Sequence, residues 1–364
     1  MSDALAIAPY TADAVSKAIA AGVPLRAQLT QLTEQASTGY VSQTFAGLGA
    51  SASVSLSVNA ALGQNQAIQA AINAATGSMG VAQSALSQIS TIASNFYSQT
   101  VNLNGLDPAT VDSIASDARS ALQEVATLLD SKDGDTYVFA GQDSGNPPVP
   151  NPDAIGSSGF ATQIAAAVGS LGGNGAPATI AATLAAASSN APGVSPFSAA
   201  LSQPAASLQA LRTSVPTGAG ASVPTGILAS ANGDVTSTGS STTGSYMRDV
   251  LRALATIGSL SSTQVGNSGF AQLVADTRTS LGGAISALNQ DAGVMGDRQT
   301  SLTDLNTALA QTATAMTAQL SNVQDVDMAS TLSKLSTVQT QLQASYEAVS
   351  VLQNLTLVHF LTTA

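Results

Sequence analysis

Residues 301–353 read SLTDLNTALAQTATAMTAQLSNVQDVDMASTLSKLSTVQTQLQASYEAVSVLQ, and this stretch decides the fold. Apolar side chains recur in it at alternating steps of three and four residues, the heptad spacing of helices that pack side by side. A helix of about 60 residues would be about 90 Å long, far longer than a globular core requires. We therefore expect long helices that pack along each other or along neighbours. The seam positions are Leu302, Leu305, Leu309, Ala313, Met316, Leu320, Val323, Leu332, Leu335, Val338, Leu342, Tyr346, Val349 and Leu352.

The first half of the chain carries the same pattern. Gly77 and Gly80 interrupt one seam, and each costs about 1 kcal/mol relative to Ala, so this helix depends on packing partners. Asp107 can cap a second helix, and Pro108 fits its first position. The two seams are Ile68, Ile72, Ala75, Met79, Ala82, Leu86, Ile89, Ala93 and Phe96, and then Val111, Ile114, Ala118, Leu122, Val125 and Leu129.

The middle of the chain, from about 141 to 244, is rich in Gly, Pro, Ser, Thr and Asn, so long helices end here. Asp133-Gly134 predicts a turn into a short strand at 136–139. Further short strands are expected at 208–215 and 221–228. Short helices fit 164–171 and 180–187.

These patterns predict a mainly α fold: long coiled-coil-like helices from both chain ends form a rod, with a small mixed α/β or β insertion domain in the middle. We expect a terminal helical assembly domain from residues 1–40 and 318–364. A helical rod domain would comprise 41–135 and 246–317, and a variable insertion domain with short strands would comprise 136–245.

Composition excludes several classes of function. Charged residues make up 9% of the 364 residues, the net charge is -11, and the ten basic residues are scattered. Nucleic acids and anionic membrane surfaces need clustered Lys and Arg, so neither is an expected partner. The chain has no Cys, which excludes disulfides and Cys-ligated zinc. No secretory signal and no run of about 18 apolar residues is evident, so we expect no membrane insertion.

Candidate catalytic and metal sites are weak. The only histidine, His359, lies near the C-terminus, where no buried carboxylate is expected to orient it. Asp130, Asp133 and Asp135 do not have the spacing of a calcium loop. Asp325 and Asp327 indicate an exposed break between helical segments rather than a metal pair. We therefore predict no catalytic, cofactor-binding or metal-binding residue, no cofactor, and no enzyme activity.

Three short motifs occur in the order found in a known family. Thr33–Gly39, TEQASTG, resembles the signature near the start of flagellins. Asp133–Gly141, followed by Pro147–Val149, is similar to a Tyr-x-Phe-Ala/Gly-Gly element and its nearby Pro. Val323–Ala329, with the helical stretch Leu332–Leu361, is similar to an Asp-x-Asp-x-Ala break and terminal helix. The chain thus resembles the flagellin family, and within it the hook-filament junction proteins (hook-associated protein 3) more than flagellin itself.

The resemblance covers about 1–150 and 246–364. The loop 40–49 lacks the Asn-Pro-Ser-Asp-Asp-Pro-like turn of the family, so its conformation is left open. The resemblance implies a secreted, extracellular, non-catalytic subunit of the flagellum that joins hook to filament and serves motility. Implied partners are the hook-side junction protein, flagellin, copies of the chain itself and an export chaperone.

Terminal seams that find no partner within one subunit can be buried against neighbours. We therefore expect the assembly interface at Leu320, Leu332, Leu335, Val338, Leu342, Val349 and Leu352. The nearest alternative is flagellin itself, which polymerises without limit. A surface adhesin is less favoured, although the Ser/Thr/Gly-rich middle would suit it.

Overall fold

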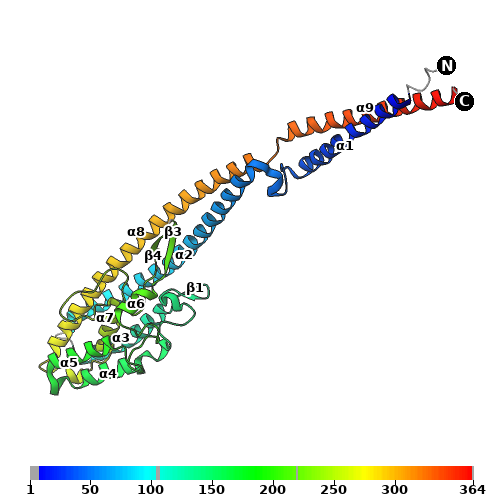
Figure 1. Cartoon of the computed structure of the whole chain (residues 1–364). Coiled ribbons are helices and arrows are strands. Elements are labelled where there is room, and N and C mark those ends of the chain that lie inside the picture. The colour runs from blue at the N-terminus through cyan, green and yellow to red at the C-terminus, as the bar shows by residue number, and fades with distance from the viewer. Residues whose placement is uncertain (1–7, 104–106, 219, 363–364) are drawn as a thin grey trace. The chain divides into compact units, whose positions relative to one another are not determined.

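The computed structural model describes residues 8–103, 107–218 and 220–362. The described chain is mainly α-helical, as the heptad patterns predict (Figure 1). Its long helices are α1 (Ala8–Thr38), α2 (Ala52–Asn102), α3 (Pro108–Leu129), α8 (Phe270–Gln324) and α9 (Met328–Thr362). The shorter helices are α4 (Gly159–Gly169), α5 (Leu171–Ser188), α6 (Ala205–Leu211) and α7 (Tyr246–Gly258). Two antiparallel ribbons pair β1 (Lys132–Asp133) with β2 (Thr136–Tyr137) and β3 (Ser214–Gly218) with β4 (Ala221–Pro224).

The chain forms two compact units. Unit 1 comprises Met1–Gln66 and Gln311–Ala364, and unit 2 comprises Ala67–Ala310. Helices α2 and α8 each run from one unit into the other. The finer division into three domains stays a prediction.

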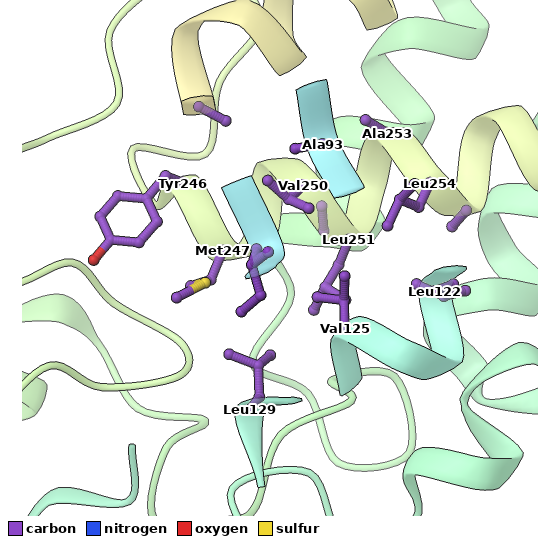
Figure 2. Close-up of a cluster of buried hydrophobic side chains, with 14 of the residues drawn as sticks. Ala93, Leu122, Val125, Leu129, Tyr246, Met247, Val250, Leu251, Ala253 and Leu254 are labelled. Carbon is purple, nitrogen blue, oxygen red and sulfur yellow. The ribbon is translucent and has the colours of Figure 1, made fainter. Parts of the chain in front are cut away.

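Helix α7 is buried along its whole length and forms the centre of unit 2. It packs against α3, α4 and α5. A fully buried Leu or Val side chain contributes about 1.5–3 kcal/mol, so α7 supplies a large share of the stability of unit 2. Figure 2 shows one cluster that includes Ala93, Leu122, Val125, Leu129, Met247, Val250, Leu251 and Leu254.

Two charged side chains of α7 are buried with polar partners, because an unpaired buried charge is strongly destabilising. The Asp249 carboxylate accepts hydrogen bonds from the Thr242 hydroxyl and from the Thr243 backbone N–H. The Arg252 guanidinium lies 3.3 Å from the Asp276 carboxylate. The loop that precedes α7 and the helix α8 are therefore both fixed to this central helix.

Arg248, which is also buried on α7, caps the C-terminus of helix α5. Its guanidinium donates to the backbone carbonyls of Ala187 at 2.9 Å and Ser189 at 3.3 Å. A cation at a helix C-terminus satisfies the last carbonyls and interacts favourably with the helix dipole. Burial lowers the pKa of Arg248 to about 10, so the side chain remains charged at neutral pH.

Asp291 of α8 holds the loop before α7 in place. Its carboxylate accepts from the Gly233 N–H at 2.5 Å, the Asp234 N–H at 2.9 Å and the Tyr246 hydroxyl at 2.8 Å. A Cβ on Gly233 would lie only 2.7 Å from this carboxylate, so the close approach needs glycine. Burial, together with Asp291, raises the pKa of Tyr246 well above its usual value. The hydroxyl therefore stays protonated and donates.

Within unit 2, α2 and α8 lie side by side (Figure 1), and a glutamine amide of each helix donates a hydrogen bond to a backbone carbonyl of the other. Gln83 of α2 donates to the Ala292 carbonyl at 3.4 Å, and Gln299 of α8 donates to the Thr76 carbonyl at 3.2 Å. A Cβ on Gly296 would lie 3.2 Å from the Gln83 amide nitrogen. Gly296 thus makes room for the hydrogen bond from Gln83 to the neighbouring helix.

The insertion contains fewer strand residues than its sequence pattern predicts. The expected helix at 180–187 lies within α5, whereas the expected helix at 164–171 covers the end of α4 and crosses the break at Ser170. The expected strand 208–215 is wrong in its first half, because α6 continues to Leu211 and only Ser214 onward is extended. Pro204 starts α6, and the Ala and Leu residues that follow favour a helix. Strands 136–139 and 221–228 are confirmed only over Thr136–Tyr137 and Ala221–Pro224.

By length and composition alone, Phe45–Val101 resembles a helix that could cross a membrane, because an 18-residue window within it has a mean hydropathy of 1.3. Core helices of soluble proteins pass the same test, so one such helix is a weak indication. Several apolar side chains of α2, among them Ile72, Met79, Leu86, Ile89 and Phe96, instead belong to the core of unit 2.

Asp130 ends α3 and anchors the loop that follows β2. Its carboxylate accepts from the Val149 N–H at 2.8 Å. Burial raises the pKa of Asp130 to about 6, above the ordinary value of 3.8. A pKa that is raised on folding adds stability below the unfolded value, and this contribution is lost as the pH rises through about 6.

Replacing Asp130 with Asn should therefore stabilise the protein at pH 8 and have little effect near pH 4. The amide oxygen can still accept from Val149 but carries no charge to desolvate. Because the group is only half-buried, we expect a gain of at most about 1 kcal/mol. Urea unfolding between pH 4 and pH 8 measures it, with Asp117→Asn, an exposed position of α3, as the control. An equal gain at both pH values would contradict this reading.

Replacing Gly293 with Ala should stabilise α8 by up to about 1 kcal/mol, because no atom lies within 4 Å of the added Cβ. The matched change Gly296→Ala should gain less by about 0.5–1 kcal/mol, because it displaces the Gln83 amide from the Ala292 carbonyl. Urea unfolding of the two variants gives the comparison. Equal gains would show that the hydrogen bond from Gln83 to the Ala292 carbonyl contributes nothing to stability.

Candidate assembly interface

Helices α1 and α9 lie side by side in unit 1 (Figure 1). Along α9, the residues that are shielded from solvent recur at steps of four and three, as the heptad pattern predicts. These residues are Thr331, Leu335, Val338, Leu342, Ser345 and Val349. The corresponding positions of α1 are Gly22, Leu25, Leu29, Leu32 and Ala36.

The two terminal helices therefore pack along each other within one chain, which is one of the two arrangements expected from the heptad pattern. One face of α9 is already covered by α1 of the same chain. Of the predicted interface residues, Val338 is buried, and Leu335, Leu342 and Val349 are half-buried on that face. Their assignment to contacts between subunits stays a prediction.

Two further predicted interface residues, Leu332 and Leu320, lie elsewhere. Leu332 projects from another side of α9 and is exposed, so it is free to contact a neighbour. Leu320 is half-buried on α8. The side chain of Leu352 lies outside the described residues.

Unit 1 buries very little apolar surface. Among the described residues, the only buried apolar side chains of this unit are Leu32, Val58 and Val338. In contrast, ten of the twelve exposed large apolar side chains in the described chain belong to unit 1. Unit 1 therefore leaves most of its large apolar side chains in contact with solvent. The ten are Ile19, Val23, Tyr40, Phe45, Val54, Leu56, Met328, Leu332, Tyr346 and Val351.

Charged groups are scarce where this apolar surface lies. No charged residue occurs between Glu34 and Asp107, a run that covers all of α2. Burying such a surface against another molecule requires no ion to lose its water. This uncharged run is the signal in the sequence from which the exposed apolar surface of α2 could have been inferred.

One polar contact also ties α1 to α9. The Arg26 Nε donates to the Tyr346 hydroxyl at 2.7 Å, and the guanidinium carbon lies 5.3 Å from the centre of the Tyr346 ring. Both side chains are exposed, so the contact contributes about 0.5–1 kcal/mol.

The break between α1 and α2 pairs with the break between α8 and α9. Val41 donates to the Gln324 carbonyl at 2.6 Å, and Val326 donates to the Gly39 carbonyl at 2.9 Å. Tyr40 and Asp325 are thus antiparallel bridge partners. The TEQASTG motif and the Asp-x-Asp motif, which lie near opposite ends of the sequence, therefore meet. We call this region, residues 38–51 together with 324–327, the helix-break region.

Local features fix both breaks. Gly39 adopts a φ of 78°, which favours glycine, and its N–H donates to the Gln35 carbonyl at 2.9 Å to end α1. Asp327 starts α9 by accepting from the Ala329 N–H at 3.0 Å and the Ser330 N–H at 3.2 Å. The prediction that Asp325 and Asp327 mark a break between helices is confirmed.

The acidic residues considered for metal binding have separate structural contacts. The Asp133 carboxylate accepts from the Ser78 hydroxyl at 2.8 Å, whereas the Asp130 carboxylate accepts from Val149. Within the described part of the chain, no group of three or more His, Asp or Glu side chains could hold a metal ion. The side chain of His359 lies outside the described residues.

In a dilute monomer, α1 and α9 should exchange their amide hydrogens much faster than α7. Two buried apolar side chains, Leu32 on α1 and Val338 on α9, cannot hold two long helices closed, whereas α7 opens only when unit 2 unfolds. Hydrogen exchange read by mass spectrometry checks this, with α7 as the internal reference. Protection of α1 and α9 equal to that of α7 would contradict it.

Residues 279–361 match the family model of the bacterial flagellin C-terminal helical region. This segment spans most of α8 and nearly all of α9, and it makes up less than a quarter of the 364 residues. No curated protein matches the chain. The match supports membership of the flagellin family, whose members are structural subunits.

Proposed function

We propose that this chain, whose C-terminal helical region matches that of bacterial flagellins, is a structural subunit that joins hook to filament in the flagellum. The observation that carries the proposal is the uneven burial in the molecule. Unit 2 has a complete core, whereas unit 1 exposes most of its large apolar side chains. Such a unit becomes stable when copies bury these side chains against each other.

Assembly would proceed in two layers of contact. Within one chain, α1 covers the Leu335, Val338 and Leu342 face of α9. Between chains, the remaining exposed sides of α1, α2 and α9 would lose solvent together. Because different surfaces meet at each contact, the contacts repeat head to tail and build an open helical structure.

The junction role within the flagellin family rests on sequence. Thr33–Gly39 and Tyr137–Gly141 resemble hook-associated protein 3 more than flagellin. The proposed partners are the hook-side junction protein, flagellin and further copies of this chain, after export to the cell exterior with the help of a chaperone. The role needs no cofactor and no catalysis.

Flagellin is the second candidate, because it would use the same helices. Electron microscopy of the purified protein, alone and with filament seeds, separates the two. Short caps or rings on seeds would support the junction role, and long filaments would support flagellin. A protein that stays monomeric in both samples would contradict both roles.

Replacing Leu335 and Leu342 together with Asp should abolish assembly and leave unit 2 folded. Both side chains face α1, seven residues apart, and two carboxylates buried there would separate α9 from α1. Sedimentation measures assembly, and near-ultraviolet circular dichroism reports the Tyr and Phe side chains of unit 2.

The matched control changes Ser333 and Thr340 to Asp. These residues have the same spacing on α9 but are exposed. The control should assemble more readily than the Leu335 and Leu342 variant. Normal assembly of the latter would remove the α1–α9 pair from the mechanism.

A further inference from the structure

The helix-break region contains a preformed hollow. A cavity of about 360 Å³ opens there, and the two aromatic side chains that line it are largely exposed. Tyr40 is 48% exposed and Phe45 is 51% exposed, and Leu48 adds a third apolar wall. Two aromatic rings left in water beside a cavity are unusual in a stable monomer.

Hydrogen bonds hold the polar groups around the hollow in place. The Thr44 hydroxyl accepts from the Gly47 N–H at 3.3 Å, and the Ser42 hydroxyl accepts from the Thr44 N–H at 3.1 Å. Gln324, on the opposite wall, donates to the Ser55 hydroxyl at 2.6 Å. These groups already have partners, and the side chains of Tyr40, Phe45 and Leu48 supply apolar surface for binding, with Gln43 as a further polar group of the lining.

The close packing of this loop also depends on Gly47. A Cβ at this position would overlap the Ser42 hydroxyl, so no other residue fits the observed backbone. The loop between α1 and α2, which lacks the expected Asn-Pro-Ser-Asp-Asp-Pro-like turn, is therefore shaped by its own contacts. The walls of the hollow are set before any partner arrives, which lowers the entropy lost on binding.

A matching projection lies on α1. Ile19 and Val23 are 54% and 63% exposed, and they stand four residues apart, so they form one ridge on the helix. The ridge lies beside the face that α9 covers, and neither side chain is buried by it. Ile and Val are of a size that a cavity of this volume can accept.

The ridge cannot fill the hollow of its own chain. Val23 lies fifteen residues before the end of α1 at Thr38, which is roughly 20 Å along the helix. A second copy is therefore the occupant that can bring a ridge to this hollow. Charge does not oppose the contact, because no charged residue lines the hollow or belongs to the ridge.

We propose that the Ile19 and Val23 ridge of one copy inserts into the Tyr40 and Phe45 hollow of the next. This inference rests on the proposed assembly of the chain into a flagellar structure and names one of its contacts. The contact is head to tail, because each copy offers a ridge at one place and a hollow at another. It adds a contact between copies to the α1–α9 pairing within each.

Two variants test the contact in the full-length protein. The hollow variant changes Tyr40 and Phe45 to Ser, and the ridge variant changes Ile19 and Val23 to Ser. All four side chains are exposed, so the circular dichroism and melting temperature of the monomer should match those of the wild type. Each variant should raise the concentration needed for assembly at least about tenfold, and the combined variant should be no worse than either alone.

Mixing gives the sharper result. The hollow variant keeps its ridge, and the ridge variant keeps its hollow. In the mixture, the ridge of the first can therefore insert into the hollow of the second, which gives one contact for each pair of chains. Equimolar mixing should give dimers by sedimentation, whereas neither variant alone should. Val101→Ser, at an exposed position of α2 in unit 2, outside the hollow and the ridge, serves as the control for lost apolar surface.

Disulfide trapping locates the contact. The chain has no Cys, so Val23→Cys mixed with Phe45→Cys can form only bonds between introduced thiols. A heterodimer under mild oxidation, and far less of it when Val101→Cys replaces Phe45→Cys, would support the contact. Assembly of both Ser variants at the wild-type concentration would overturn the inference and leave the proposed function intact. A wild type that never assembles would overturn both.

Discussion

Unit 1 has too little buried apolar surface to stabilise its long helices, and the rest of the architecture follows from this constraint. Helix α9 gains one partner, α1, and that contact buries Leu32 and Val338. Ten large apolar side chains in the same unit remain in water. Ordering α1 and α9 costs about 1–2 kcal/mol per residue in backbone entropy, which so small a core does not offset. A second source of burial is required.

Unit 2 meets the same requirement internally. Helix α7 is buried on every side, and its apolar side chains pack on α3 while its charged side chains bind the loop before it, α5 and α8. Each buried charge has polar partners, so the centre of the unit contains no uncompensated ion. The unit can therefore remain folded while unit 1 changes its contacts. This division fits the proposed function, in which the subunit is exported before it assembles.

The helix-break region links the N-terminal and C-terminal parts of the chain. Backbone hydrogen bonds from Val41 and Val326 join the end of α1 to the start of α9, so the two helices are held together where they meet the rest of the chain. The same loop carries exposed aromatic side chains around a hollow. One short segment thus serves both the folding of unit 1 and, as we propose, its contact with a second copy.

The sequence alone determined the helical class, the helix ends and the scarcity of charge. Heptad spacing predicted α2, α3, α8 and α9, Asp107 and Pro108 predicted the start of α3, and Asp325 and Asp327 indicated a break between helices, because these signals act within a few residues. Only the tertiary structure showed that α1 covers the Leu335, Val338 and Leu342 face of α9. It alone also paired the two distant motifs and showed that Tyr40 and Phe45 flank a hollow. A heptad pattern states that a helix has an apolar face, but not which other segment covers it, because that depends on packing between residues hundreds of positions apart.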